Sequence, residues 1–236
     1  MGNRIGSCLA TKLLCKREPL VLVAFGAGGQ IYAHVQLLLS TFPSLKDCII
    51  VNRTQNDRLT QLKADLELVY KQATFSFIAA SYGDSIDSDA ILESVVSMAD
   101  IICTATSSVK ALFRTEWVKT GVHINLVGSY TPQMQEVDKD LICRASRVAV
   151  DSKDACLHEA GELIQAGLPR ERLVEVGELL DETGQPLDAL IDEVKRGDVT
   201  IFKSVGVGIQ DVAIAQAVLT RAQETGIGAN ITGFDD

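Results

Sequence analysis

No stretch of the sequence is apolar for long enough to cross a membrane. The longest candidate begins at Leu20 and turns into Gly26-Ala27-Gly28-Gly29 after six residues, whereas a span needs about 20 apolar residues. Of the 236 residues, 47% are hydrophobic and 22% are charged, which is typical of a globular chain with a sizeable core. This composition excludes a disordered chain, a collagen-like fibre and a disulfide-stapled miniprotein. The sequence therefore predicts a soluble protein of one or two domains without a membrane partner.

Patterns typical of metal sites and hydrolases are also missing. The six cysteines include no C-x-x-C pair, and the three histidines are scattered, so no metal site is predicted. His123 lies on an apparent strand and is interpreted as a packed core histidine. No Ser-His-Asp order or nucleophile elbow is present, which argues against a hydrolase. Cysteines in apolar runs, as in Ile101-Ile102-Cys103, behave as small hydrophobes and predict buried free thiols in a reducing, cytoplasmic compartment.

The charge of the chain is negative and unevenly distributed. The net charge of −9 disfavours binding to nucleic-acid backbones. Residues 151–198 carry 13 acidic and 5 basic residues, or −8, so the remainder is close to neutral at −1. This near-neutral remainder is free to form a local cationic pocket for a small anion.

Strands alternate with helices between residues 20 and 150. The apolar runs predict strands at Leu20–Phe25, Asp47–Val51, Phe75–Ala79, Asp100–Thr104, His123–Val127 and Arg147–Val150. Helical spacing predicts helices at Cys8–Lys16, Gln30–Thr41, Arg58–Tyr70, Ile91–Met98, Phe113–Lys119 and Val137–Cys143. Beyond residue 150, a strand at Val199–Val205 and a helix at Gly208–Gln223 are predicted. This order favours an α/β fold with a doubly wound parallel sheet, whose ligand site lies at the carboxyl ends of the strands.

The first strand leads through a glycine-rich turn into a helix. In the dinucleotide fingerprint, the first glycine allows the tight turn and the second lets the backbone approach the pyrophosphate at the helix amino terminus. Gly26 and Gly28 match these two positions, but Ile31 replaces the third glycine. We interpret the turn as a nucleotide site rather than as a glycine-rich turn without a ligand.

The end of the second strand predicts the kind of nucleotide. A site specific for NAD(H) would show Asp or Glu here, paired with the ribose hydroxyls. The chain has Asn52-Arg53-Thr54 instead. No carboxylate is present to repel a 2′-phosphate, and Arg53 can bind one through two hydrogen bonds. NADP(H) is therefore favoured over NAD(H).

The ordered motifs together resemble the ornithine cyclodeaminase/mu-crystallin family, nearly from end to end. They are Ala10-Thr11-Lys12, Gly26-Ala27-Gly28-Gly29-Gln30 with His34, Asn52-Arg53-Thr54, Ala99–Thr106, Gly121–Asn125, Val150-Asp151-Ser152, Glu159–Glu162, Gly177-Glu178 and Phe202–Gly206. The resemblance implies a Rossmann NAD(P)-binding domain and a second domain that binds substrate and forms a dimer. It also implies the residues that line the cofactor, namely Gly28, Gly29, Gln30, Asn52, Arg53, Thr54, Thr104, Ala105, Thr106 and Val127, with Ser204 near the nicotinamide.

Two departures from the family pattern matter for function. Cyclodeaminases place a catalytic Asp where this chain has Ser129, and a serine hydroxyl has no comparable basicity near neutral pH. Ser129 is interpreted either as a substrate residue, as in the mu-crystallin branch, or as a turn residue. Glu159 matches a ligand-site glutamate of that branch, or is a solvated acid. Only nine residues precede Ala10, so the portion that supplies most of the substrate domain is expected to be missing.

The leading hypothesis is an NADPH-dependent oxidoreductase that reduces a small imine derived from an amino acid. One alternative is an NADPH-binding protein without turnover, and another is a lyase of the ornithine cyclodeaminase type, so enzyme activity stays open and no catalytic residue is named.

The predicted divisions are a helical lead-in at 1–18, a Rossmann domain at 19–198, and a carboxy-terminal strand and helix at 199–236 that pack toward the substrate domain. Homodimer formation is doubtful without the amino-terminal half.

Overall fold

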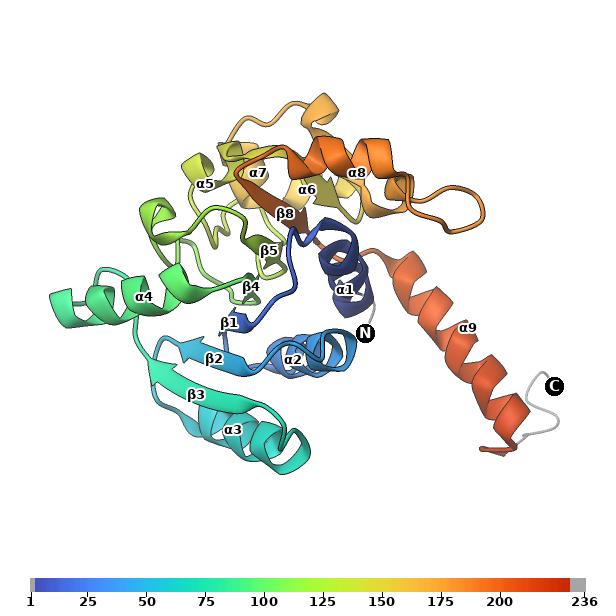
Figure 1. The fold of residues 1–236 in the computed structure, drawn as a ribbon, viewed down its shortest axis with the longest axis horizontal. Coiled ribbons are helices and arrows are strands. Elements are labelled where there is room, and N and C mark those ends of the chain that lie inside the picture. The colour runs from blue at the N-terminus through green and yellow to red at the C-terminus, as the bar shows by residue number, and fades with distance from the viewer. Residues whose placement is uncertain (1–2, 230–236) are drawn as a thin grey trace.

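The computed structural model describes residues 3–229, which form an α/β fold around one parallel sheet (Figure 1). The eight strands follow the order β3-β2-β1-β4-β5-β8-β6-β7, and every neighbouring pair is parallel. The strands are β1 Val21–Phe25, β2 Asp47–Asn52, β3 Thr74–Ala79, β4 Ile101–Thr104, β5 His123–Leu126, β6 Ala145–Val150, β7 Leu173–Glu175 and β8 Val199–Lys203. The strand order reverses direction between β1 and β4, which is where sheets of this kind bind ligands.

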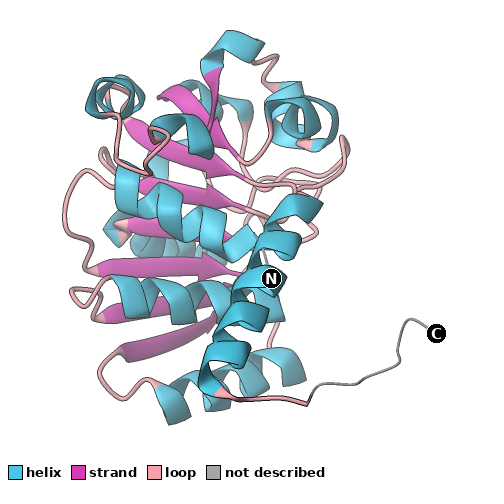
Figure 2. Ribbon diagram, turned by 90° about the vertical axis from the view of Figure 1, so that its right-hand side faces the viewer, coloured by secondary structure: helices cyan, strands magenta, loops and turns pink. Residues whose placement is uncertain are grey.

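Helices cover both faces of the sheet (Figures 1 and 2). They are α1 Asn3–Leu14, α2 Gly29–Thr41, α3 Asp57–Val69, α4 Ile86–Met98, α5 Lys139–Cys143, α6 Lys153–Glu159, α7 Gly161–Gln165, α8 Asp188–Lys195 and α9 Gly208–Thr225, with short 3₁₀ turns at Thr115–Trp117, Arg170–Arg172 and Val176–Leu179. Alternate residues of β1 enter different cores: Leu22 packs with α2 and α3, whereas Val23 packs with α4. Burial on both faces explains why these strands are continuous apolar runs.

The predicted parallel α/β sheet is confirmed, with local differences. The strand β7 has three residues and was not predicted, because so short a run shows no periodicity. The helix α4 begins at Ile86 rather than Ile91. Ser85 caps it by accepting a hydrogen bond from Ser88 N–H, and the first turn is exposed, so it shows no apolar pattern in the sequence. The predicted helix at Phe113–Lys119 is only the 3₁₀ turn Thr115–Trp117.

All six cysteines are free, but the prediction of buried thiols holds only in part. Three are buried, Cys8 and Cys15 are half-buried, and Cys143 is exposed. Within residues 3–229, no helix is both long and apolar enough to cross a membrane.

The two outer segments of the predicted division contact the central sheet. The helix α1 packs with α8 and with Phe202 of β8. The strand β8 lies between β5 and β6, and all of its residues are buried. The strand of the segment 199–236 thus lies inside the Rossmann sheet, where parallel partners on both sides satisfy its backbone. The predicted division of the chain stays a prediction.

The helix α9 behaves differently from β8. It extends away from the sheet (Figure 1), and none of its residues is buried. Ile209, Val212 and Val218 are 75%, 68% and 61% exposed. Apolar side chains are thus exposed along the part of the segment that the structure describes; residues 230–236 lie outside it.

His123 makes the stability of the fold depend on pH. Its ring is fully buried on β5, where Nδ1 lies 2.9 Å from Thr200 Oγ1, which confirms a packed core histidine. Burial lowers the pKa of His123 to about 3. Between this value and the ordinary value near 6.5, the unfolded chain binds a proton that the folded chain does not, so stability falls as the pH falls.

We expect this histidine to lower the free energy of unfolding by about 2 kcal/mol between pH 7.5 and pH 5. Urea unfolding at a series of pH values measures the effect. The control is His123→Asn, which does not titrate in this range and should lack this part of the slope. Equal slopes for the two proteins would contradict the assignment.

Candidate nucleotide-binding site

The turn between β1 and α2 leaves backbone N–H groups without a side-chain cap and with free space around Gly28. Gly26 has φ +122°, and a Cβ there would lie 2.9 Å from the carbonyl oxygen of Ala105, so glycine is needed for both conformation and space. Gly28 precedes α2 without a side-chain cap, and a Cβ on it would meet nothing within 4 Å. The first N–H groups of α2 are therefore available to an anion. Ile31, at the third fingerprint position, is fully buried between helix and sheet.

The turn after β2 holds Arg53 at the site. The side-chain amide of Asn52 donates a 2.7 Å hydrogen bond to the carbonyl oxygen of Thr54, which closes the turn around Arg53. Asn56 then caps α3 by accepting a 3.0 Å hydrogen bond from Leu59 N–H. The Arg53 side chain is exposed and makes no ion pair or hydrogen bond with any residue between 3 and 229.

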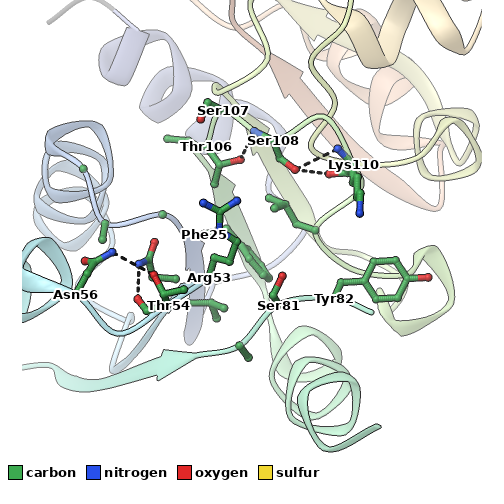
Figure 3. Close-up of a pocket in the computed structure, with 18 of the residues that line it drawn as sticks. Phe25, Arg53, Thr54, Asn56, Ser81, Tyr82, Thr106, Ser107, Ser108 and Lys110 are labelled. Carbon is green, nitrogen blue, oxygen red and sulfur yellow. Dashed lines mark hydrogen bonds between the residues drawn. The ribbon is translucent and has the colours of Figure 1, made fainter. Parts of the chain in front are cut away.

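A cleft of about 600 Å³ opens at the carboxyl ends of β1, β2, β3 and β4. Figure 3 shows Arg53 in this cleft, between Thr54 on one side and Thr106 on the other, with Tyr82 and Lys110 farther along. The predicted cofactor residues that line it are Gly26, Gly28, Asn52, Arg53, Thr54, Ala105 and Thr106. Much of the lining of this cleft was therefore predicted from the sequence, and contact of these residues with a cofactor stays a prediction.

The cleft is cationic. Arg53, Arg58 and Lys110 line it, whereas Asp84 is the only acidic residue that residues 3–229 contribute to its lining. The side chains of these three cations form no ion pair within the described chain. Unpaired cations beside an open helix amino terminus suit a ligand that carries phosphate.

Several residues of this cleft were not predicted from the sequence. Arg58 lies in the first turn of α3 and also lines a second hollow, beside Gly29 and Tyr32. Its position shortly after Asn52-Arg53-Thr54 is a signal that could have identified it. Tyr82 and Lys110 lie in loops with no periodic pattern, so only the folded chain brings them to the cleft.

The other predicted cofactor residues lie outside the main cleft. Gly29 lines the second hollow, and Gln30 is exposed on the first turn of α2. Thr104 and Val127 are buried at the ends of β4 and near β5. Ser204 is buried after β8, and its hydroxyl donates a 2.7 Å hydrogen bond to Asp151.

The structure does not bring the two predicted substrate residues together. The Ser129 side chain is fully buried; its hydroxyl donates to the carbonyl oxygen of Met134 at 3.0 Å and accepts from Gly161 N–H at 3.1 Å. Glu159 is exposed at the end of α6, whereas Glu162 is the buried carboxylate of this region. A substrate role for Ser129 or Glu159 stays a prediction.

The fold and the cleft define a class of protein. A doubly wound parallel sheet with an open glycine turn after β1 and a cationic cleft beside it is a Rossmann-type dinucleotide-binding domain. The residues present fit a dinucleotide, because the space over Gly28 is open and the cleft supplies cations for phosphate. No group of three or more His, Cys, Asp or Glu residues in the described part of the chain is arranged to hold a metal ion.

The chain belongs to the ornithine cyclodeaminase/mu-crystallin family, which it matches over residues 5–226. The Δ(1)-pyrroline-2-carboxylate reductase of Bacillus cereus is 33% identical to it over 230 residues, which are 95% of this chain and 64% of the relative. The ketimine reductase mu-crystallin of Macropus fuliginosus is 32% identical over 212 residues, covering 90% of this chain and 58% of the relative. The chain thus spans less than two thirds of the length of these relatives.

A solved structure agrees with this assignment. The iminosuccinate reductase of Paracoccus denitrificans, in complex with NAD+, has a TM-score of 0.74 with this chain at 27% identity. The match covers 95% of this chain and 63% of the reductase. The predicted Rossmann fold and family are therefore confirmed, and the relatives named here are reductases.

Proposed function

We propose that this protein is an NADPH-dependent reductase of small imines derived from amino acids. The single observation that carries the choice of cofactor is Arg53, an unpaired guanidinium at the end of β2, where a carboxylate would select NAD(H). The choice of substrate class is supported by the relatives, which are named as reductases of pyrroline-2-carboxylate and of ketimines.

The side chains of the cleft would bind the adenosine half of the nucleotide. Arg53 would donate two hydrogen bonds to the 2′-phosphate, and the N–H groups after Gly28 would hold the pyrophosphate. Val127 and Ser204, after the ends of β5 and β8, would then lie beside the nicotinamide. When bound, the reduced nicotinamide supplies a hydride to the imine carbon, while the imine nitrogen takes up a proton.

One observation favours a second candidate, nucleotide binding without turnover. The Ser129 hydroxyl is buried and has both a donor and an acceptor partner within the chain. To contact a substrate, it would have to give up one of these hydrogen bonds. The two candidates share the cofactor site and differ only in whether hydride is transferred.

A titration followed by a turnover assay tests the proposal. We expect quenching or enhancement of nucleotide fluorescence at micromolar NADPH, with weaker binding of NADH, because only NADPH carries the 2′-phosphate. Addition of Δ(1)-pyrroline-2-carboxylate should then oxidise NADPH, as read from loss of its absorbance. Binding without oxidation, across a panel of cyclic and open-chain imines, would favour the second candidate. Absence of binding by either nucleotide would contradict both.

A further inference from the structure

Glu136 is a buried carboxylate that joins the loops at the carboxyl ends of β4 and β5. It lies between Ser129 and α5 and is fully buried. Its Oε1 accepts hydrogen bonds from the backbone N–H and the hydroxyl of Thr106, at 2.7 and 2.9 Å. Its Oε2 accepts from the Thr104 hydroxyl and from Gly128 N–H, both at 2.7 Å. One carboxylate thus ties together two loops that are far apart in the sequence.

Both oxygens of Glu136 act as acceptors for these partners. Each oxygen of Glu136 faces a backbone N–H, from Thr106 or Gly128, and an N–H cannot act as an acceptor. Burial raises the pKa of Glu136 above its ordinary value, and the charge of Lys203 and the hydrogen bonds from Thr104 and Thr106 offset only part of this rise. An amide at this position would direct its NH₂ group at one of the two backbone N–H groups. That N–H would lose its acceptor, and the NH₂ group would find none in its place.

The two loops are also in direct contact. A Cβ on Gly128 would lie 2.0 Å from the carbonyl oxygen of Thr106 and 2.4 Å from Glu136 Oε1, so the missing side chain lets the loops meet. On the other side of this contact, Ala105 and Thr106 line the nucleotide cleft. The position of this wall of the cleft therefore depends on the contacts of Thr106 with Gly128 and Glu136.

We propose that Glu136 is a positioning residue for the nucleotide. Glu136 does not line the cleft itself; it acts through the loop after β4, which it holds against Gly128 so that Ala105 and Thr106 form the wall of the cleft. The inference rests on the nucleotide site proposed above and assigns a role to a residue outside that site.

The test compares Glu136→Gln with Glu162→Gln. Glu162 is the matched control, because it is also buried and lies 3.1 Å from Lys203, but within residues 3–229 it makes no hydrogen bond to a loop of the cleft. NADPH affinity is measured by fluorescence titration, and amide hydrogen exchange at Thr106 and Gly128 is measured without nucleotide. We expect Glu136→Gln to weaken NADPH binding by about tenfold or more and to speed exchange at both amides, and Glu162→Gln to change affinity by less than about twofold.

Equal losses of affinity in the two variants, or unchanged exchange at Thr106 and Gly128, would overturn the proposal. If Glu136→Gln does not fold, Gly128→Ala gives the same readouts, because its methyl group separates the loops and leaves every charge in place. A wild-type chain that binds no NADPH would overturn the proposed function instead. The comparison of amide hydrogen exchange needs no nucleotide. It would still show whether Glu136 stabilises the loop that contains Thr106.

Discussion

Replacing Arg53 with alanine should weaken NADPH binding by about ten- to a hundredfold and leave NADH binding within about twofold. The reason is that Arg53 is the unpaired cation at the end of β2, where the 2′-phosphate of NADPH would lie. NADH has no phosphate at this position. Fluorescence titration of both nucleotides at two salt concentrations measures the selectivity, and the loss should be smaller at high salt, where charge interactions are screened.

Three further variants make this result specific. Arg53→Lys keeps the charge but not the planar pair of donors, so its affinity should lie between those of wild type and Arg53→Ala. Arg221→Ala removes an exposed arginine on α9, away from the cleft, and should change neither affinity. Arg58→Ala tests the neighbouring cation of the cleft. A selective loss of NADPH affinity in Arg58→Ala, with none in Arg53→Ala, would contradict the role of Arg53.

Replacing Lys203 with methionine should lower the free energy of unfolding by about 3–5 kcal/mol. Lys203 is fully buried at the end of β8, where Nζ donates to the carbonyl oxygen of Ser129 and lies 3.1 Å from Glu162 Oε1. Glu136 and Glu162 are both buried. Removing the cation would leave these two carboxylates without the positive charge of Lys203. An uncompensated buried charge is strongly destabilising. Urea unfolding measures the change.

Lys119→Met is the matched control for this prediction. Lys119 lies 3.0 Å from the carboxylate of Asp100, nearly the same separation as in the buried pair, but its side chain is 32% exposed. Water screens such a pair, so the loss should stay within about 1 kcal/mol. The double variant Lys203→Met/Glu162→Gln should recover part of the stability, because it also removes one unpaired carboxylate. A loss in Lys203→Met no larger than in Lys119→Met would contradict the prediction.

Local patterns account for the parts of the structure that the sequence analysis predicted correctly. Strands buried on both faces are continuous apolar runs, so β1, β2, β4 and β5 are visible without knowledge of their partners. Gly26 and Gly28 follow β1 directly, and Arg53 follows β2. Because the carboxyl ends of parallel strands meet at one edge of a sheet, these short motifs were enough to predict a shared nucleotide site. Segments without such a pattern, such as β7 and the first turn of α4, were missed.

The sequence by itself thus determined the type of sheet and the glycine and arginine residues at the edge where the cleft opens, because these depend on neighbours along the chain. Only the tertiary structure decided which distant residues meet. It placed β8 between β5 and β6, gave the Ser129 hydroxyl a hydrogen bond from Gly161 N–H, and brought the Glu136 carboxylate within hydrogen-bond distance of Thr106. The physical reason is that a buried carboxylate or hydroxyl must find donors and acceptors wherever the fold supplies them, and no spacing in the sequence records those contacts.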